Sequence, residues 1–181
     1  ALKSHPLKKV IVVSSTRVYG ESAGERVDDD TSPQPSDAQG QVLLNMETLW
    51  QQAYPSECVI VRPTGIYGTS VARMIKLAET IETYPKLHWS NRIHVDDLAA
   101  FLAHLLHVEH TEKSYICTNS RPLPLHEIIQ WFQQQLGLPA LVLESNKSSG
   151  KQIYATRMQQ MNFELQHPHC FDDYLALLVE R

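Results

Sequence analysis

Three hydroxyl side chains follow directly after the first apolar run of this sequence. The run is VIVV over Val10–Val13, and Ser14, Ser15 and Thr16 come next. Four consecutive β-branched residues are typical of a strand that is buried on both faces. Ligands of open parallel sheets bind at the carboxyl ends of the strands, so hydroxyls in this place could hydrogen-bond a substrate or a cofactor. The alternative is a core strand that ends in an ordinary Ser/Thr-rich turn.

A second apolar strand is predicted over residues 57–62, with 63–68 as its exit loop. Between the two strands, residues 37–53 are predicted to form an amphipathic helix, because apolar residues recur at helical spacing. The members of this stripe are Val42, Met46, Leu49 and Ala53. Strand, helix and strand with this spacing predict a right-handed parallel crossover. We therefore expect a parallel sheet whose central strand is Val10–Ser15, next to Glu57–Arg62.

The rest of the chain is expected to alternate helices with short strands. Residues 21–38, rich in Asp, Ser, Pro and Gly, are predicted to form a long irregular surface loop. Further strands are predicted at 86–89, 114–118 and 141–143, a polar loop at Ser145–Lys151, and the last turn of a helix at 1–5. Helices are predicted at 70–82, 125–136, 156–161 and 172–180, and a further helix runs up to residue 107. Asp96 or Asp97 is predicted to cap the helix that ends near 107, and Thr156 to cap the helix at 156–161. Gly137 and Asn162 are predicted to end their helices in the left-handed conformation.

Composition places this chain among ordinary globular proteins, with 181 residues, 43% hydrophobic and 20% charged. A formal charge of −4 and a pI of about 6.1 give no reason to expect nucleic acid, and no apolar run is long enough to span a membrane. Cys58, Cys117 and Cys170 form no CxxC pair, which predicts reduced thiols in a cytoplasmic protein. No metal site is predicted, because the histidines form neither HxxxH nor HExxH, and His167 and His169 flank a proline.

Four motifs stand in a fixed order along the chain: SSTRVYG at 14–20, RPTGIYG at 62–68, RIHVDDLA at 92–99 and NKSSGK at 146–151. Together they resemble the extended short-chain dehydrogenase/reductase superfamily, the NAD(P)-dependent nucleotide-sugar epimerases and dehydratases, and most of all an atypical branch described as nucleoside-diphosphate-sugar epimerase-like. The resemblance implies an α/β fold, a partial Rossmann-type parallel sheet with flanking helices plus a small α+β C-terminal lobe. It assigns residues 1–70 to the C-terminal half of the core and residues 71–181 to the substrate lobe and closing elements, with 92–107 packing back on the core.

The family's nucleotide-binding turn has no counterpart in this sequence. Family members hold the cofactor pyrophosphate at a Gly-rich turn after the first strand, whereas the seven glycines here form no GxxGxxG. The chain therefore resembles the C-terminal two-thirds of the family, without the Gly-rich N-terminal half. The resemblance implies NAD or NADP as the cofactor of a full-length member, and we expect this chain alone to bind it weakly or not at all.

The resemblance also assigns the reacting residues. Ser15 holds the position of the family's catalytic Ser or Thr, and Thr16 lies beside it. In the family, the Tyr of a YxxxK motif is the general base, and the Lys lowers the pKa of that Tyr. Tyr19 is a nearby phenol and the candidate that could stand in as the acid/base.

The YxxxK motif itself is altered in this chain. Glu47 matches a Glu that often follows the family Tyr by eight residues, so Gln39 and Leu43 occupy the Tyr and Lys positions. A Gln amide does not ionise in the accessible pH range, and Leu carries neither charge nor donors. We therefore expect the ordinary Tyr–Lys chemistry to be absent.

Further residues are implied for the cofactor, the substrate and the lobe. Ser14, Pro63, Thr64 and Gly65 correspond to cofactor-binding residues, and Tyr67 and Arg92 to substrate-binding residues. The alternative for the loop at 63–65 is a turn that only ends a strand. His94 and Asp97 match residues that fasten the lobe to the core, and Lys147 and Lys151 are interpreted as solvated charges of a polar loop.

Two classes of function remain open. The first is an NAD(P)-dependent nucleotide-sugar epimerase/dehydratase-like protein with altered chemistry, and the second is a non-catalytic sensor or scaffold that binds a dinucleotide or a partner. The edge of the strand at Val10–Ser15 and the apolar stripe of helix 37–53 are expected to stay uncovered. Such surfaces recruit other chains, so we expect self-association through them or a partner that covers them.

Overall fold

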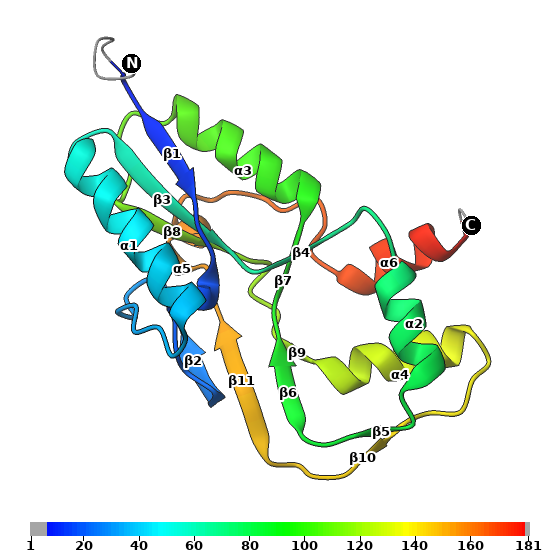
Figure 1. Ribbon diagram of the computed structural model, residues 1–181. Coiled ribbons are helices and arrows are strands. Elements are labelled where there is room, and N and C mark those ends of the chain that lie inside the picture. The colour runs from blue at the N-terminus through cyan, green and yellow to red at the C-terminus, as the bar shows by residue number, and fades with distance from the viewer. Residues whose placement is uncertain (1–6, 180–181) are drawn as a thin grey trace.

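A parallel sheet forms the larger half of the molecule. The computed structural model describes residues 7–179, so the helical turn predicted at 1–5 lies outside the described residues. Strands β1 (Val10–Val13), β3 (Cys58–Pro63) and β8 (Ser114–Cys117) pair in the order β1–β3–β8, all parallel. Helix α1 (Ala38–Ala53) connects β1 to β3, and the sheet lies between α1 and α3 (Val95–His107) (Figure 1). The predicted crossover and the partial Rossmann-type fold are confirmed.

The central strand of this sheet is β3, and the prediction that Val10–Ser15 is central was wrong. Every residue of β3 is buried, whereas the β1 residue Val13 is 47% exposed. Within residues 7–179, β1 pairs only with β3 and its other edge has no strand neighbour. An unbroken β-branched run therefore identified both strands correctly, but it could not tell which of them has neighbours on two sides.

A second sheet contains two segments for which loops were predicted. Its order is β2 (Ala23–Val27), β11 (Ser148–Ile153), β6 (Leu87–Ser90) and β9 (Leu123–Pro124). Strand β2 lies within the predicted 21–38 loop, and β11 overlaps the predicted polar loop 145–151. Most residues of these two strands are small or polar, and only Val27 and Ile153 at their ends are buried, so their sequences carry no apolar alternation. Backbone pairing with β6 and β2 holds β11 in place, and burial contributes at its last residue, Ile153.

The remaining elements join the two sheets and build the smaller half (Figure 1). Two short parallel pairs connect distant segments, β4 (Gly65–Tyr67) with β7 (Arg92–His94) and β5 (Thr83–Tyr84) with β10 (Val142–Leu143). The other helical elements are the 3₁₀ turn η2 (Thr16–Val18), α2 (Ala72–Thr80), α4 (Leu125–Gln135), α5 (Thr156–Gln160) and α6 (Cys170–Val179). None of the helices within residues 7–179 combines the length and apolar character that a membrane crossing requires.

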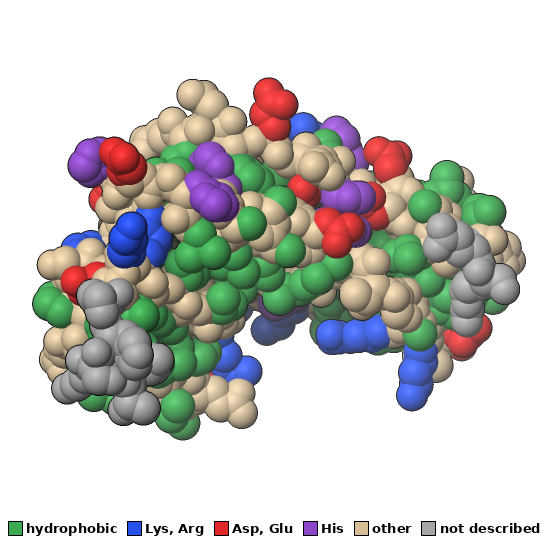
Figure 2. All heavy atoms as spheres, turned by 90° about the horizontal axis from the view of Figure 1, so that it is seen from above, with side chains coloured by type: hydrophobic (Ala, Val, Ile, Leu, Met, Phe, Trp, Pro, Cys, Tyr) green, Lys and Arg blue, Asp and Glu red, His purple; other side chains and the backbone are tan. Residues whose placement is uncertain are grey.

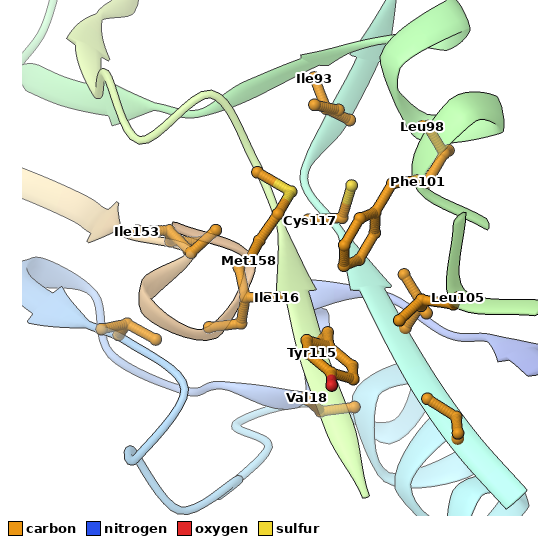
Figure 3. Close-up of a cluster of buried hydrophobic side chains, with 14 of the residues drawn as sticks. Val18, Ile93, Leu98, Phe101, Leu105, Tyr115, Ile116, Cys117, Ile153 and Met158 are labelled. Atoms are coloured by element: carbon orange, nitrogen blue, oxygen red, sulfur yellow. The ribbon is translucent and has the colours of Figure 1, made fainter. Parts of the chain in front are cut away.

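Two hydrophobic clusters carry the fold. The first lies between β3, β8, α3 and α5, where Phe101, Leu105, Ile116 and Met158 are fully or almost fully buried (Figure 3). The second lies between α2, α4 and α6 and is centred on Phe132, against which the Tyr174 ring packs at 5.1 Å between centroids. The first cluster draws residues from both sides of position 70, and the domain boundary predicted there stays a prediction.

Helix ends agree with the sequence at some positions and differ at others. Asp37 caps α1 by accepting from the Gly40 N–H at 2.7 Å, and Gly137 (φ 66°) follows α4 in the left-handed conformation, as predicted. Asn162 (φ 54°) also takes the predicted left-handed conformation after α5. Two cap predictions were wrong, because His94 caps α3 in place of Asp96 or Asp97 and Ala155 is the residue before α5 in place of Thr156.

Asp29 connects three parts of the structure through one carboxylate. It is 5% exposed, and it accepts from the Ile116 N–H at 2.6 Å, the Thr156 hydroxyl at 3.0 Å and the Arg157 N–H at 2.9 Å. Thr156 therefore uses its hydroxyl to bind Asp29, which explains why it does not cap its own helix. The segment after β2 is tied in this way to β8 and to α5.

Candidate functional site

The predicted catalytic hydroxyls lie where the two sheets meet. Ser15 and Thr16 follow β1, and they line a cavity of about 740 Å³ together with Thr64 and Gly65 from the end of β3. The Ser15 Oγ accepts from the Arg17 N–H at 3.2 Å and so begins the turn η2. We call this the Ser15 cavity. The structure thus brings together the residues that sequence had placed at the ends of two separate strands.

One hydroxyl at this edge has no hydrogen-bond partner. Ser14 is 8% exposed, and its Oγ is among the buried polar atoms that remain unpaired within residues 7–179. Leaving a buried hydroxyl unpaired costs about 1–3 kcal/mol, so such a group is a candidate for contact with a ligand. Thr16 and Thr64 differ from it, because they donate to the Pro63 carbonyl and the Thr118 hydroxyl respectively.

Gln39 and Leu43, which the resemblance assigns to the family Tyr and Lys positions, do not line this cavity. Gln39 is exposed on α1, and Leu43 packs against the first hydrophobic cluster. Helix α1 nevertheless lies very close to the Ser15 loop, since a Cβ at Gly40 would meet the Arg17 carbonyl oxygen at 2.7 Å. The helix therefore approaches the site as it must in this fold, but it presents neither a phenol nor an ammonium group there.

Tyr19, the candidate for an alternative acid/base, is held inside the protein by Arg62. Its hydroxyl accepts from Arg62 at 2.8 Å, and Arg62 also donates to the Glu47 carboxylate at 2.7 and 3.0 Å. All three side chains are buried, and burial is the main reason why the pKa of Tyr19 is raised. The prediction that Tyr19 is a catalytic acid/base is therefore not supported by its position, which is that of an internal structural residue.

The two predicted substrate-binding residues line a second cavity of about 230 Å³. Arg92 is 8% exposed and donates to the Tyr174 hydroxyl at 2.7 Å and to the Ser90 hydroxyl at 2.9 Å. No carboxylate within residues 7–179 lies within 4 Å of its guanidinium. Tyr67 donates to Asp173 at 2.6 Å, and burial together with that carboxylate raises the pKa of the phenol. A buried cation without an acidic partner makes this cavity suitable for an anion.

A set of polar contacts fastens the C-terminal segment beside this second cavity. The Asp97 carboxylate accepts from the backbone N–H groups of Gln166 and His167 at 2.8 and 3.0 Å. His167 also pairs with Asp173 at 2.6 Å, and this hydrogen bond raises the pKa of the imidazole. Asp97 therefore holds a distant segment, as the resemblance implied, although this role belongs to its carboxylate and not to a helix cap.

His94, His167 and Asp173 place their ligand atoms within 4.8 Å of one another. The two imidazole rings stack at 3.6 Å between centroids with an angle of 13° between their planes. Nitrogen lone pairs lie in the ring planes, so nearly parallel rings direct them along separate lines and not toward one ion. His94 also accepts from the Asp96 N–H through Nδ1. The cluster is organised by hydrogen bonds and stacking.

Residues of the second sheet complete the Ser15 cavity, and sequence reasoning missed them. His88, Trp89 and Lys151 line it opposite Ser15. Lys151 was interpreted as a solvated charge, but its ammonium is half-buried and donates to the Tyr19 carbonyl. Burial lowers the pKa of this lysine. The only signal in the sequence is Gly150 inside this polar run, because a glycine within a strand often marks a bulge.

Comparison with known proteins agrees with this arrangement. No family model and no curated protein matches the sequence. A solved structure from Methylobacillus flagellatus, provisionally assigned as an NAD-dependent epimerase/dehydratase, is 36% identical with a TM-score of 0.84, and the match covers 99% of this chain and 66% of that one. The NAD complex of dTDP-glucose 4,6-dehydratase from Bacillus anthracis (16% identity, TM-score 0.73, 96% and 62% covered) and UDP-N-acetylglucosamine 4-epimerase from Bacillus cereus (14%, 0.74, 96% and 64%) share the fold.

The sheet, the crossover and the site at the strand ends define an epimerase-like Rossmann protein. This chain belongs to the short-chain dehydrogenase/reductase superfamily and shares the fold of its NAD-dependent epimerases and dehydratases. It spans less than two-thirds of the length of each of these three proteins.

Proposed function

We propose that this chain forms the substrate-binding part of an NAD(P)-dependent nucleotide-sugar epimerase/dehydratase-like protein whose Tyr–Lys pair is degenerate. The observation that carries the proposal is Arg92, a buried guanidinium with no carboxylate within 4 Å among the described residues. Tyr174 and Ser90 hold its side chain in a fixed direction at the second cavity. A diphosphate supplies the missing negative charge and can accept from an arginine through two oxygens.

Only one end of the dinucleotide has candidate contacts in this chain. The unpaired Ser14 hydroxyl and the loop of Pro63, Thr64 and Gly65 fit the nicotinamide side of a cofactor. When bound, the cofactor supplies hydride transfer. No Gly-rich turn for the pyrophosphate is encoded here, so we expect NAD or NADP to bind this chain weakly.

The test is titration of the chain with UDP-glucose by calorimetry or by NMR. We expect Arg92→Gln to weaken binding by about ten- to a hundred-fold, because a charge-assisted contact contributes about 1.5–3 kcal/mol. Arg121→Gln removes an exposed guanidinium outside both cavities and is the matched control. Arg92→Lys retains the positive charge. Binding by Arg92→Lys together with weak binding by Arg92→Gln would show that the lost charge, and not a disturbed fold, weakens the binding. Equal binding by the wild type and Arg92→Gln would contradict the proposal.

The second candidate function is a non-catalytic sensor or scaffold of the same fold. The observation that favours it is the placement of Gln39 and Leu43 outside the Ser15 cavity, together with the internal role of Tyr19. Turnover separates the two candidates. Loss of a positioned acid/base costs about 10²–10⁴-fold in rate, so we expect little or no epimerase or dehydratase activity. Robust turnover that Ser15→Ala abolishes would exclude the scaffold.

We also propose self-association through α1 and the free edge of β1. Val42 and Leu49 on α1 are 66% and 65% exposed, and Val13 at the end of β1 is 47% exposed. Exposed apolar side chains on one helix face favour contact with another chain. A cytoplasmic location is kept as part of the proposal, because Cys58, Cys117 and Cys170 are free and buried.

A further inference from the structure

The Ser15 cavity has an unusual charge balance. Among the residues that line it, Arg17, His88 and Lys151 are basic, and none is Asp or Glu. The remaining lining residues are mainly hydroxyl, amide and glycine residues together with Trp89. In the space-filling view the molecule is hollowed at its lower margin, with Lys and Arg side chains on both sides of the hollow (Figure 2). A recess with this lining attracts negatively charged ligands.

Lys151 is directed by a defect in its own strand. The register of β11 against β2 shifts between Gly150 and Lys151, which is a β-bulge. Gly150 has φ +72°, and a Cβ there would meet the Trp89 carbonyl oxygen at 2.7 Å, so no other residue fits without strain. Asn91 fixes the strand after the bulge, because it donates to the Lys151 carbonyl and accepts from the Ile153 N–H, both at 2.8 Å. Bulges commonly redirect a side chain beside an active site.

Lys151 is the cation of this cavity that has no counter-ion. Arg17 already pairs with Asp37 at 3.0 Å, and the His88 imidazole is bonded to the Ser149 hydroxyl at 3.1 Å. The Lys151 ammonium donates to the Tyr19 carbonyl, and no described carboxylate lies within 4 Å of it. Glu21, Asp37 and Glu25 act on it only at longer range. An ammonium has three donors, so this one retains donors for a ligand.

We propose that the Ser15 cavity binds a second anionic group of the substrate, a carboxylate or a phosphate, through Lys151. The inference rests on the proposed function for the identity of the substrate as a sugar derivative. Arg92 lines the second cavity and Lys151 lines the Ser15 cavity, and the two cavities adjoin, because Gly65, Ser90 and Asn91 line both. A substrate that spans them can place its diphosphate at Arg92 and a second anionic group at Lys151. The substrate class is therefore an acidic sugar and not a neutral hexose. The hydroxyls of Ser15 and Thr16 line the same cavity and accompany Lys151 there.

The test is an NMR titration of the full chain, with lysine side-chain and backbone signals, using methyl glucuronoside, glucose 1-phosphate, inorganic phosphate and methyl glucoside. We expect the wild type to bind at least one anion, and Lys151→Met to weaken that binding by about ten-fold or more. Lys147→Met removes an exposed ammonium four residues away and should change nothing. Lys151→Arg keeps the charge and should bind the anion. Preference for glucuronoside or for the phosphates identifies the acidic group.

Several results would overturn the inference. Equal binding of methyl glucoside and the acidic probes would show that charge is not recognised. Equal loss in Lys147→Met would show a general electrostatic effect, and binding of none of the anions would remove the site. A parallel titration with UDP-glucose keeps the two proposals apart. Binding of UDP-glucose without any acidic monosaccharide overturns only this inference, and the reverse result overturns only the proposed function.

Discussion

The two sheets that border the Ser15 cavity are stabilised in different ways. The β1–β3–β8 sheet lies between helices, and its central strand is buried along its whole length. The β2–β11–β6–β9 sheet is made of short, partly exposed strands, two of which contain a glycine at positive φ, Gly24 and Gly150. The first contributes hydroxyls at its strand ends, and the second contributes a lysine and a histidine. A charged side chain is costly in an apolar layer, and Lys151 lies in the more polar of the two sheets.

The largest effect is expected from the ion pair between Glu47 on α1 and Arg62 on β3 of the first sheet. Glu47→Gln leaves the buried Arg62 without its carboxylate, and the free energy of unfolding should fall by about 3–5 kcal/mol. Urea denaturation measures this change. Asp30→Asn, which breaks a pair whose carboxylate is 88% exposed, should cost less than about 1 kcal/mol. If Glu47→Gln lowered the free energy of unfolding as little as Asp30→Asn does, the ion pair would not stabilise the core.

A smaller loss is expected from the bulge in the second sheet. Gly150→Ala forces an alanine into the left-handed conformation, which costs about 1–2 kcal/mol. The variant also places a Cβ against the Trp89 carbonyl oxygen. Gly137→Ala is the matched control, because it has φ +66° but no atom within 4 Å of its Cβ. The difference in unfolding free energy between the two variants measures the clash alone. Identical values would mean that the strand adjusts without resistance.

A pH-dependent effect is expected at the pair of His167 and Asp173. The pKa of His167 is raised in the folded protein by Asp173, with smaller contributions from Asp97 and Asp96. Its contribution is therefore fully present below the unfolded pKa of about 6.5 and is lost as the pH rises through the folded pKa. His167→Gln should lower the free energy of unfolding more at pH 5.5 than at pH 9, by less than about 1 kcal/mol, which urea denaturation at the two pH values measures. His110→Gln, at an exposed histidine, should show no such difference.

The smallest effect on stability is expected at the exposed face of α1. Val42→Glu and Leu49→Glu change side chains that are mostly in solvent, so the free energy of unfolding should move by about 0.5 kcal/mol or less. Sedimentation should nevertheless show a shift toward monomer. Gln41→Glu adds the same charge at a polar position of the helix and should leave the assembly unchanged. A wild type that is monomeric at high concentration would contradict the proposal.

The sequence predicted the parts of this structure that burial determines. The apolar runs at β1 and β3, the helices α2 and α4 and the turn at Gly137 were predicted from local signals, and each is confirmed. Strands β2 and β11 have none, because their partners lie far away along the chain and their residues are polar. Ser15 could be placed at the site because it follows the apolar run of β1. Lys151 could not, because it lies in the polar strand β11. Tyr19 shows the opposite limit, since proximity in sequence did not reveal that its hydroxyl binds Arg62.

The three hydrogen bonds of Asp29 have a consequence for the order of folding. Its partners are 87, 127 and 128 residues away along the chain, so these bonds close long loops, and we expect them to form late in folding. Interactions that are absent from the folding transition state affect mainly the rate of unfolding. Asp29→Asn should therefore accelerate unfolding while refolding keeps its pace, which stopped-flow chevron measurements can record. On this view the Asp29 carboxylate contributes to kinetic stability, because it slows the unfolding of the folded chain.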